Sequence, residues 1–160
     1  MLKNKKRIAT GILSAYIALV FAQSLFSKFS GSPETQNIFG TLNSWAANEF
    51  GYENLFLPPG IFNAYNIASA ELLASILLLV GLLINKRALC FIGALLSFCI
   101  INGAITFHLF TPLGIEVNDD GGAMFKLACG VWLCSILIMT INLDAIFKKL
   151  EMTPKSPAEA

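Results

Sequence analysis

The sequence is poor in charged residues. Only 13% of its 160 residues are Asp, Glu, Lys or Arg, whereas 56% are hydrophobic and the mean hydropathy is +0.68. A soluble domain usually carries charge on about a quarter of its residues, so this chain has too little polar surface to be one. The composition predicts an integral membrane protein whose main partner is the lipid bilayer. It shows no feature of a nucleic-acid-binding protein.

Residues that could carry a redox group are also scarce. His108 is the only histidine, so a haem would lack a second axial histidine. No two cysteines have the Cys-x-x-Cys spacing that thiol–disulfide chemistry would use, and all four lie in hydrophobic runs: Cys90, Cys99, Cys129 and Cys134. We interpret them as core residues. Any electron-carrying cofactor would then belong to a ligand or to a partner protein.

Long hydrophobic runs are what the chain does have. Four are close to the roughly 20 residues that a helix needs to cross the hydrocarbon core: about 8–26, 65–84, 88–110 and 123–141. The longest stretch between them, 27–64, is too short for a soluble core of its own. We therefore expect an all-α protein with one domain, residues 1–145, folded as a four-helix transmembrane bundle. The polar, proline-containing segment 146–160 is expected to be a disordered tail.

The basic residues give the predicted orientation. Most of them flank one end of the four runs: Lys3, Lys5, Lys6, Arg7, Lys86, Arg87, Lys148, Lys149 and Lys155. The positive-inside rule then places both termini in the cytoplasm, and we expect a bacterial inner (cytoplasmic) membrane. The basic start and Ala22-Gln23-Ser24 also fit a secretory signal. The three later runs favour a first transmembrane helix instead.

The connection between the first two runs has a helical pattern of its own. Ser32-Pro33-Glu34 supplies an N-cap residue, a proline at the first helical position and an acid in the first turn. Apolar residues then recur at spacings of three and four: Ile38, Leu42, Trp45, Ala46 and Phe50. This predicts an amphipathic helix on the outer surface of the bundle. A substrate lid is the alternative.

Glu71 is the most unusual residue of the second run, which is otherwise uncharged. A carboxylate at membrane depth costs roughly 2.5–3.5 kcal/mol, so it marks a candidate functional site. Lys28, His108 and Lys126 fall at the same outer level when helical rise is counted along each run. Small residues share the helix faces of Lys28, Glu71 and His108, which predicts that these three side chains face one interior.

Several motifs resemble the DoxX family of four-helix membrane proteins. They lie in order from residue 8 to residue 141: Ser27-Lys28-Phe29, Ala70-Glu71-Leu72-Leu73, Gly103-Ala104-Ile105-Thr106-Phe107-His108-Leu109 and the loop from Thr111 to Gly122. Where family members often carry a glycine before the lysine, this chain has Ser24 and Ser27. The resemblance implies the fold, an association with a quinone-reducing oxidoreductase and a redox partner protein. It maps the family's lysine, acid and histidine onto Lys28, Glu71 and His108.

Three functions remain open for these residues. In the first, the protein is a redox-associated membrane subunit that binds a quinone or similar lipophilic molecule. His108 would then hydrogen-bond to a quinone carbonyl, Glu71 would relay protons, and Lys28 would hold Glu71 ionised or poised. In the second, Glu71 and His108 are the catalytic acid and base of an intramembrane enzyme. In the third, the polar cluster is structural and binds nothing. Transport is disfavoured, since the inner half offers few polar residues to line a water path.

Asp119 and Asp120 precede the fourth run and raise the question of a metal site. Further oxygen ligands at regular spacing are missing, so we predict no metal. Acids before a helix more often cap it. We expect that role here, and Lys126 is placed to pair with one of the two aspartates.

Overall fold

The computed structural model describes residues 2–151, and every regular element in this range is a helix. The helices are α1 (Leu2–Phe29), α2 (Pro33–Phe50), α3 (Ala64–Leu83), α4 (Arg87–Phe110) and α5 (Ala123–Glu151). Four of them contain segments long and apolar enough to cross a membrane: Asn4–Phe29, Ala64–Leu83, Arg87–Phe110 and Ala123–Phe147. This confirms the predicted fold class.

The last helix extends further than the sequence predicts. The expected tail begins at residue 146, but α5 continues to Glu151. Residues 146–151 contain no proline or glycine, so nothing in them interrupts a helix. The rest of the expected tail, 152–160, lies outside the described residues.

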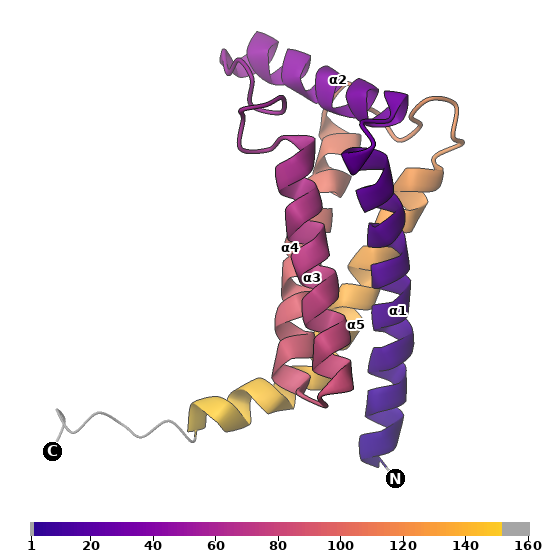
Figure 1. The fold of residues 1–160 in the computed structure, drawn as a ribbon, viewed down its shortest axis with the longest axis vertical. Coiled ribbons are helices and arrows are strands. Elements are labelled where there is room, and N and C mark those ends of the chain that lie inside the picture. Colours follow the sequence, from indigo (N-terminus) through magenta and orange to yellow (C-terminus); the bar gives the residue numbers. More distant parts are fainter. Residues whose placement is uncertain (1, 152–160) are drawn as a thin grey trace, which may run out of the picture.

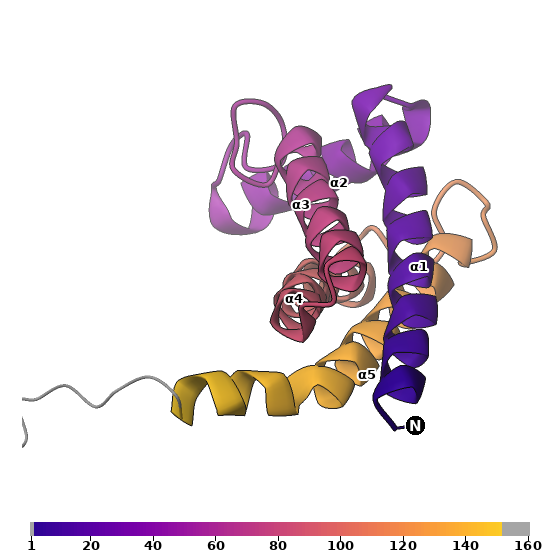
Figure 2. The same cartoon turned by 60° about the horizontal axis from the view of Figure 1, so that its bottom comes forward.

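The four long helices pack in chain order around the bundle. α1 packs against α3 and α5, and α4 packs against the same two helices, so α1 and α4 lie diagonally across the bundle (Figures 1 and 2). The shared core contains Ile17 and Phe21 from α1, Leu78 from α3 and Val131 from α5. This order decides which polar side chains can meet.

α2 lies across one end of the bundle, which we name the α2 end (Figure 1). Ser32 caps the helix, since its side chain accepts a hydrogen bond from the Thr35 N–H, and Gly51 ends it with a left-handed φ of 71°. The apolar face of α2 contributes Phe39, Leu42 and Ala46 to a second core cluster, which also contains Phe56, Leu113 and Val117. The predicted amphipathic helix between the first two spans is confirmed.

Candidate functional site

Glu71 and Lys28 meet between α3 and α1 near the α2 end. The Lys28 Nζ lies 2.7 Å from the Glu71 Oε1, and their side chains are only 13% and 6% exposed. Ser24, one turn before Lys28, donates a hydrogen bond of 3.3 Å to the same oxygen and accepts one from Lys28. We name these three residues the Lys28–Glu71 site. The structure thus supplies the partner that a buried carboxylate needs.

The second oxygen of Glu71 is left without a partner. Among the described residues, no group donates a hydrogen bond to the buried Glu71 Oε2. The nearby Ser75 hydroxyl donates to the Glu71 backbone carbonyl, at 2.9 Å, and not to the carboxylate. An unsatisfied buried acceptor costs about 1–3 kcal/mol. The Glu71 Oε1 therefore has hydrogen-bond partners, whereas the Oε2 has none among the described residues.

His108 lies in the last turn of α4, and its contacts are with residues outside the Lys28–Glu71 site. Its Nδ1 is 2.6 Å from the carbonyl oxygen of Gly114, in the α4–α5 loop, so Nδ1 carries the proton and donates it. The ring packs edge-on against Phe125, with 5.7 Å between centroids. Within residues 2–151 no hydrogen bond or ion pair joins His108 to Lys28 or Glu71. The structure thus brings together two of the three predicted side chains: α4 packs against α3, but the His108 ring contacts Gly114 and Phe125 and not Glu71.

One of the two loop acids, Asp120, caps α5. The carboxylate of Asp120 accepts hydrogen bonds from the backbone N–H groups of Val117, Gly122 and Met124, at 3.1, 2.8 and 2.9 Å. Lys126 is exposed and donates to the carbonyl of Gly121, at 2.8 Å. No ion pair connects it to an aspartate in the described part of the chain. The capping interpretation is thus confirmed for Asp120.

Acid is expected to weaken this cap. The N–H of Met124 foremost, then those of Val117 and Gly122, hold the pKa of Asp120 below its ordinary value, and His108 nearby lowers it further. A lowered folded-state pKa contributes stability that is present above the unfolded value, about 3.9, and is lost as the pH falls through the folded value. Asp120→Asn should therefore lose less thermal stability than the parent between about pH 5 and pH 3.

The measurement is the unfolding midpoint in detergent, followed by circular dichroism across this pH range. Asp119→Asn is the matched control, because within the described chain no N–H donates to the Asp119 side chain. Equal acid sensitivity in the parent and in Asp120→Asn would contradict the assignment.

Comparison with known families identifies the chain. The family model described as DoxX matches residues 11–109, which is 99 of 160 residues and includes Lys28, Glu71 and His108. The chain belongs to the DoxX family. Searches of curated proteins and of solved structures found no match. Membership of the DoxX family, together with the four apolar helices, makes the chain an integral membrane protein that contacts the lipid bilayer.

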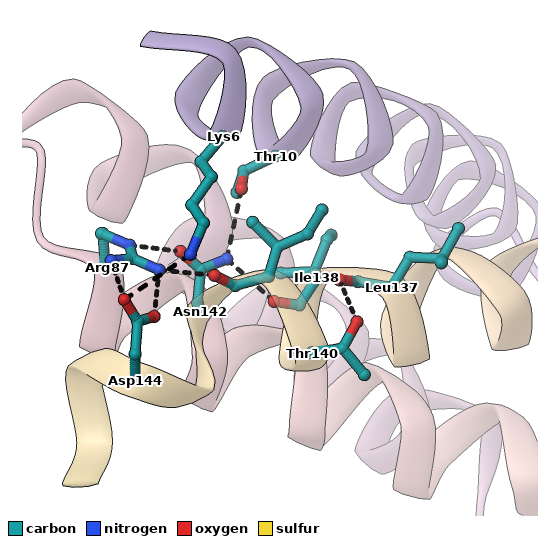
Figure 3. Close-up of polar contacts among 9 residues, drawn as sticks. Lys6, Thr10, Arg87, Leu137, Ile138, Thr140, Asn142 and Asp144 are labelled. Atoms are coloured by element: carbon teal, nitrogen blue, oxygen red, sulfur yellow. Dashed lines mark hydrogen bonds and ion pairs between the residues drawn. The ribbon is translucent and has the colours of Figure 1, made fainter. Parts of the chain in front are cut away.

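This DoxX protein has a second polar network (Figure 3), which lies at the end of the bundle opposite α2 (Figure 1). Arg87 donates to the Asn142 Oδ1 at 3.0 Å and to both carboxylate oxygens of Asp144. The Asn142 amide donates to Thr10 at 3.2 Å, and Lys6 lies 3.6 Å from Asp144. The network ties α1, α4 and α5 together where α5 turns away from the bundle (Figure 2). We interpret it as a structural clamp.

Sequence reasoning used Lys6 and Arg87 only for orientation and missed Asn142 and Asp144. A usable signal existed. Asn142 and Asp144 follow the fourth apolar run, at the end where the basic residues gather. They therefore offer an amide and a carboxylate at the same depth as Lys6 and Arg87.

The DoxX protein also has a hollow on its α2 end. Its volume is about 530 Å³, and it is lined by residues of α2, including Trp45, Asn48 and Glu49, and by Pro112. None of Lys28, Glu71 and His108 lines it. Among the described residues, no group of three or more His, Cys, Asp or Glu side chains is placed to hold a metal ion.

Proposed function

We propose that this DoxX protein is a redox-associated membrane subunit that binds a quinol, the reduced form of a quinone, at the Lys28–Glu71 site. The observation that carries the proposal is the Glu71 Oε2, which is buried and lacks a donor among the described residues. A ligand hydroxyl would complete the site, and family membership favours a quinone as the ligand. The same membership favours a redox partner protein.

The chemistry of the carboxylate selects the reduced form. In its ion pair with Lys28, Glu71 is a carboxylate, which accepts hydrogen bonds and donates none. A quinol hydroxyl can donate to Oε2, whereas a quinone carbonyl cannot. When the quinol is oxidised it loses two electrons and two protons. Both electrons would go to the oxidised partner protein. Glu71 would take one proton, and the second would be released to water at the α2 end.

His108 has no ligand contact in this proposal, in contrast to the sequence hypothesis. Its Nδ1 proton is already donated to Gly114, so we assign it to holding the α4–α5 loop. The acid–base enzyme would need His108 and Glu71 to face one substrate. No hydrogen bond or ion pair in the described structure joins them.

A second candidate is a structural role with no ligand. Its supporting observation is the burial of the pair: a Glu71 side chain that is 6% exposed leaves little room for a ligand until neighbouring side chains move. In that case Lys28 and Glu71 would only fix the register of α1 against α3.

The proposed location follows from charge. Exposed basic residues gather at the end of the bundle opposite α2. They are Lys5 and Arg7 of α1 and Lys86 in the turn between α3 and α4. Cytoplasmic loops are rich in such residues. We therefore place both termini in the cytoplasm and the protein in a bacterial cytoplasmic membrane.

The test is equilibrium binding of a short-chain benzoquinol to the protein in lipid nanodiscs, under anaerobic conditions. Glu71→Gln should weaken quinol binding about tenfold or more, because a hydrogen bond to a charged group is worth about 1.5–3 kcal/mol. His108→Ala should bind as the parent does. Ser135→Ala is the matched control, since it removes another buried hydroxyl, which donates to the Val131 carbonyl within α5.

Two results would contradict the proposal. One is equal quinol binding by the parent and Glu71→Gln. The other is binding of the oxidised quinone as tight as that of the quinol. Either would favour the structural role.

A further inference from the structure

The surface of α4 that faces away from the bundle carries polar side chains. Asn102 and Thr106 are both exposed, and so is Cys99, one turn earlier. Residues three, four and seven positions apart share one face of a helix. These three side chains therefore form a single strip, which we name the Asn102 face.

The Asn102 face lies at membrane depth. Asn102 comes eight residues before Phe110, the last residue of α4, which is about 12 Å along the helix, and about 22 Å from Arg87 at the other end. A hydrocarbon core about 30 Å thick covers this position. Lipid tails offer no hydrogen-bond partner, so a polar group exposed to them is costly.

The protein satisfies only part of this polar strip. The Trp132 Nε1 of α5 donates to the Asn102 Oδ1 at 3.1 Å, and the Thr106 hydroxyl donates to the Asn102 backbone carbonyl at 2.8 Å. Among residues 4–147, whose side chains the structure describes, none accepts a hydrogen bond from the Asn102 Nδ2. The side-chain NH₂ of Asn102 is therefore exposed at membrane depth without an acceptor among these residues.

We propose that the Asn102 face joins two copies of this chain in a homodimer. A side-chain amide carries both a donor and an acceptor, so it can pair with an identical amide. A two-fold axis along the membrane normal places identical residues at the same depth, so each Asn102 Nδ2 can meet the Asn102 Oδ1 of the second copy. Polar side chains of this kind hold helices together in lipid.

The backbone beside Asn102 is open to such an approach. A Cβ placed on Gly103 would meet no atom within 4 Å, so the chain itself leaves this surface unoccupied. Small residues let helices in membranes come close enough for their polar groups to pair. The interface does not involve the Lys28–Glu71 site, so the proposed dimer does not depend on the proposed quinol binding.

Cys99 is a native cysteine on the Asn102 face, so disulfide cross-linking through it can test for the dimer. In a variant with Cys90, Cys129 and Cys134 changed to alanine, copper–phenanthroline and oxygen would oxidise two Cys99 thiols, one from each copy, to a disulfide. We expect a disulfide-linked dimer in native membranes. Cys99→Ser should abolish it. Asn102→Leu should reduce its yield roughly fivefold, since two interhelical hydrogen bonds are lost, and Asn102→Gln should restore most of it.

The matched control uses another exposed helix face at a similar depth. Leu73 of α3 is 51% exposed, and Leu73→Cys in a chain without the four native cysteines should give no linked dimer. Circular dichroism of each variant verifies folding, and native mass spectrometry of the parent should show the mass of two chains.

Three outcomes would overturn the proposal. They are the absence of a Cys99-linked dimer, a yield that Asn102→Leu leaves unchanged, and linkage of the Leu73→Cys variant as efficient as linkage through Cys99, which would indicate random collision. A Cys99 link to a different protein would likewise exclude the second copy as the occupant.

Discussion

Replacing Glu71 with alanine is expected to destabilise the protein by about 3–5 kcal/mol, because it leaves the Lys28 ammonium buried without its carboxylate. Lys28 is only 13% exposed and its Nζ lies 2.7 Å from Glu71, so the lost attraction is not replaced by water. Lys28→Met should cost a similar amount, since the carboxylate would then be stranded. Unfolding in mixed detergent micelles, followed by tryptophan fluorescence, measures both effects.

The double variant gives the sharper result. Lys28→Met combined with Glu71→Leu removes both charges and should be less destabilised than either single variant, because a buried ion pair can often be replaced by apolar side chains at little cost. Ser75→Ala is the matched control and should cost less than about 1.5 kcal/mol, since it removes only a hydroxyl that bonds within α3. Strictly additive losses in the double variant would show that the two groups do not stabilise each other.

A methyl group added at Gly93 should cost about 1–3 kcal/mol through overpacking. A Cβ at this position would lie 2.9 Å from the backbone nitrogen of Leu78 and 3.1 Å from the carbonyl oxygen of Ala74. These are backbone atoms of α3, so they cannot rotate away as a side chain can. Gly93→Ala would therefore push α3 and α4 apart along their whole contact.

Gly11→Ala provides the comparison for this substitution. Gly11 also lies inside a long helix, but a Cβ there would meet nothing within 4 Å. Alanine is the better helix former by about 1 kcal/mol, so Gly11→Ala should leave the stability unchanged or raise it slightly. The same micelle titration applies. Equal effects at Gly11 and Gly93 would contradict the view that Gly93 is needed for the close contact of α3 with α4.

Local signals explain why the helices could be predicted. The four apolar runs and the Ser32 cap are properties of neighbouring residues, and each appears in the structure at nearly the expected place. The convergence of Lys28 and Glu71 was also accessible, since helical rise and periodicity put both on inward faces at one level. The same signals left open whether Glu71 pairs with Lys28 or with His108. Neither prediction required knowledge of how the helices pack in three dimensions.

Loop conformation and long-range contacts explain what could not be predicted. His108 also faces inward at the right level, yet its acceptor is the carbonyl of Gly114, in a loop where that glycine has a left-handed φ of 72°. That loop conformation cannot be read from periodicity. The contacts of Asn142 and Asp144 with Arg87 depend likewise on helices that are distant in the chain.

The spacing of Lys28 and Glu71 has a consequence for the order of synthesis. The two residues are 43 positions apart, and the lysine comes first. A chain made from its N-terminus delivers α1 to the membrane before α3. The acid of α3 therefore enters a bilayer in which its cation is already present.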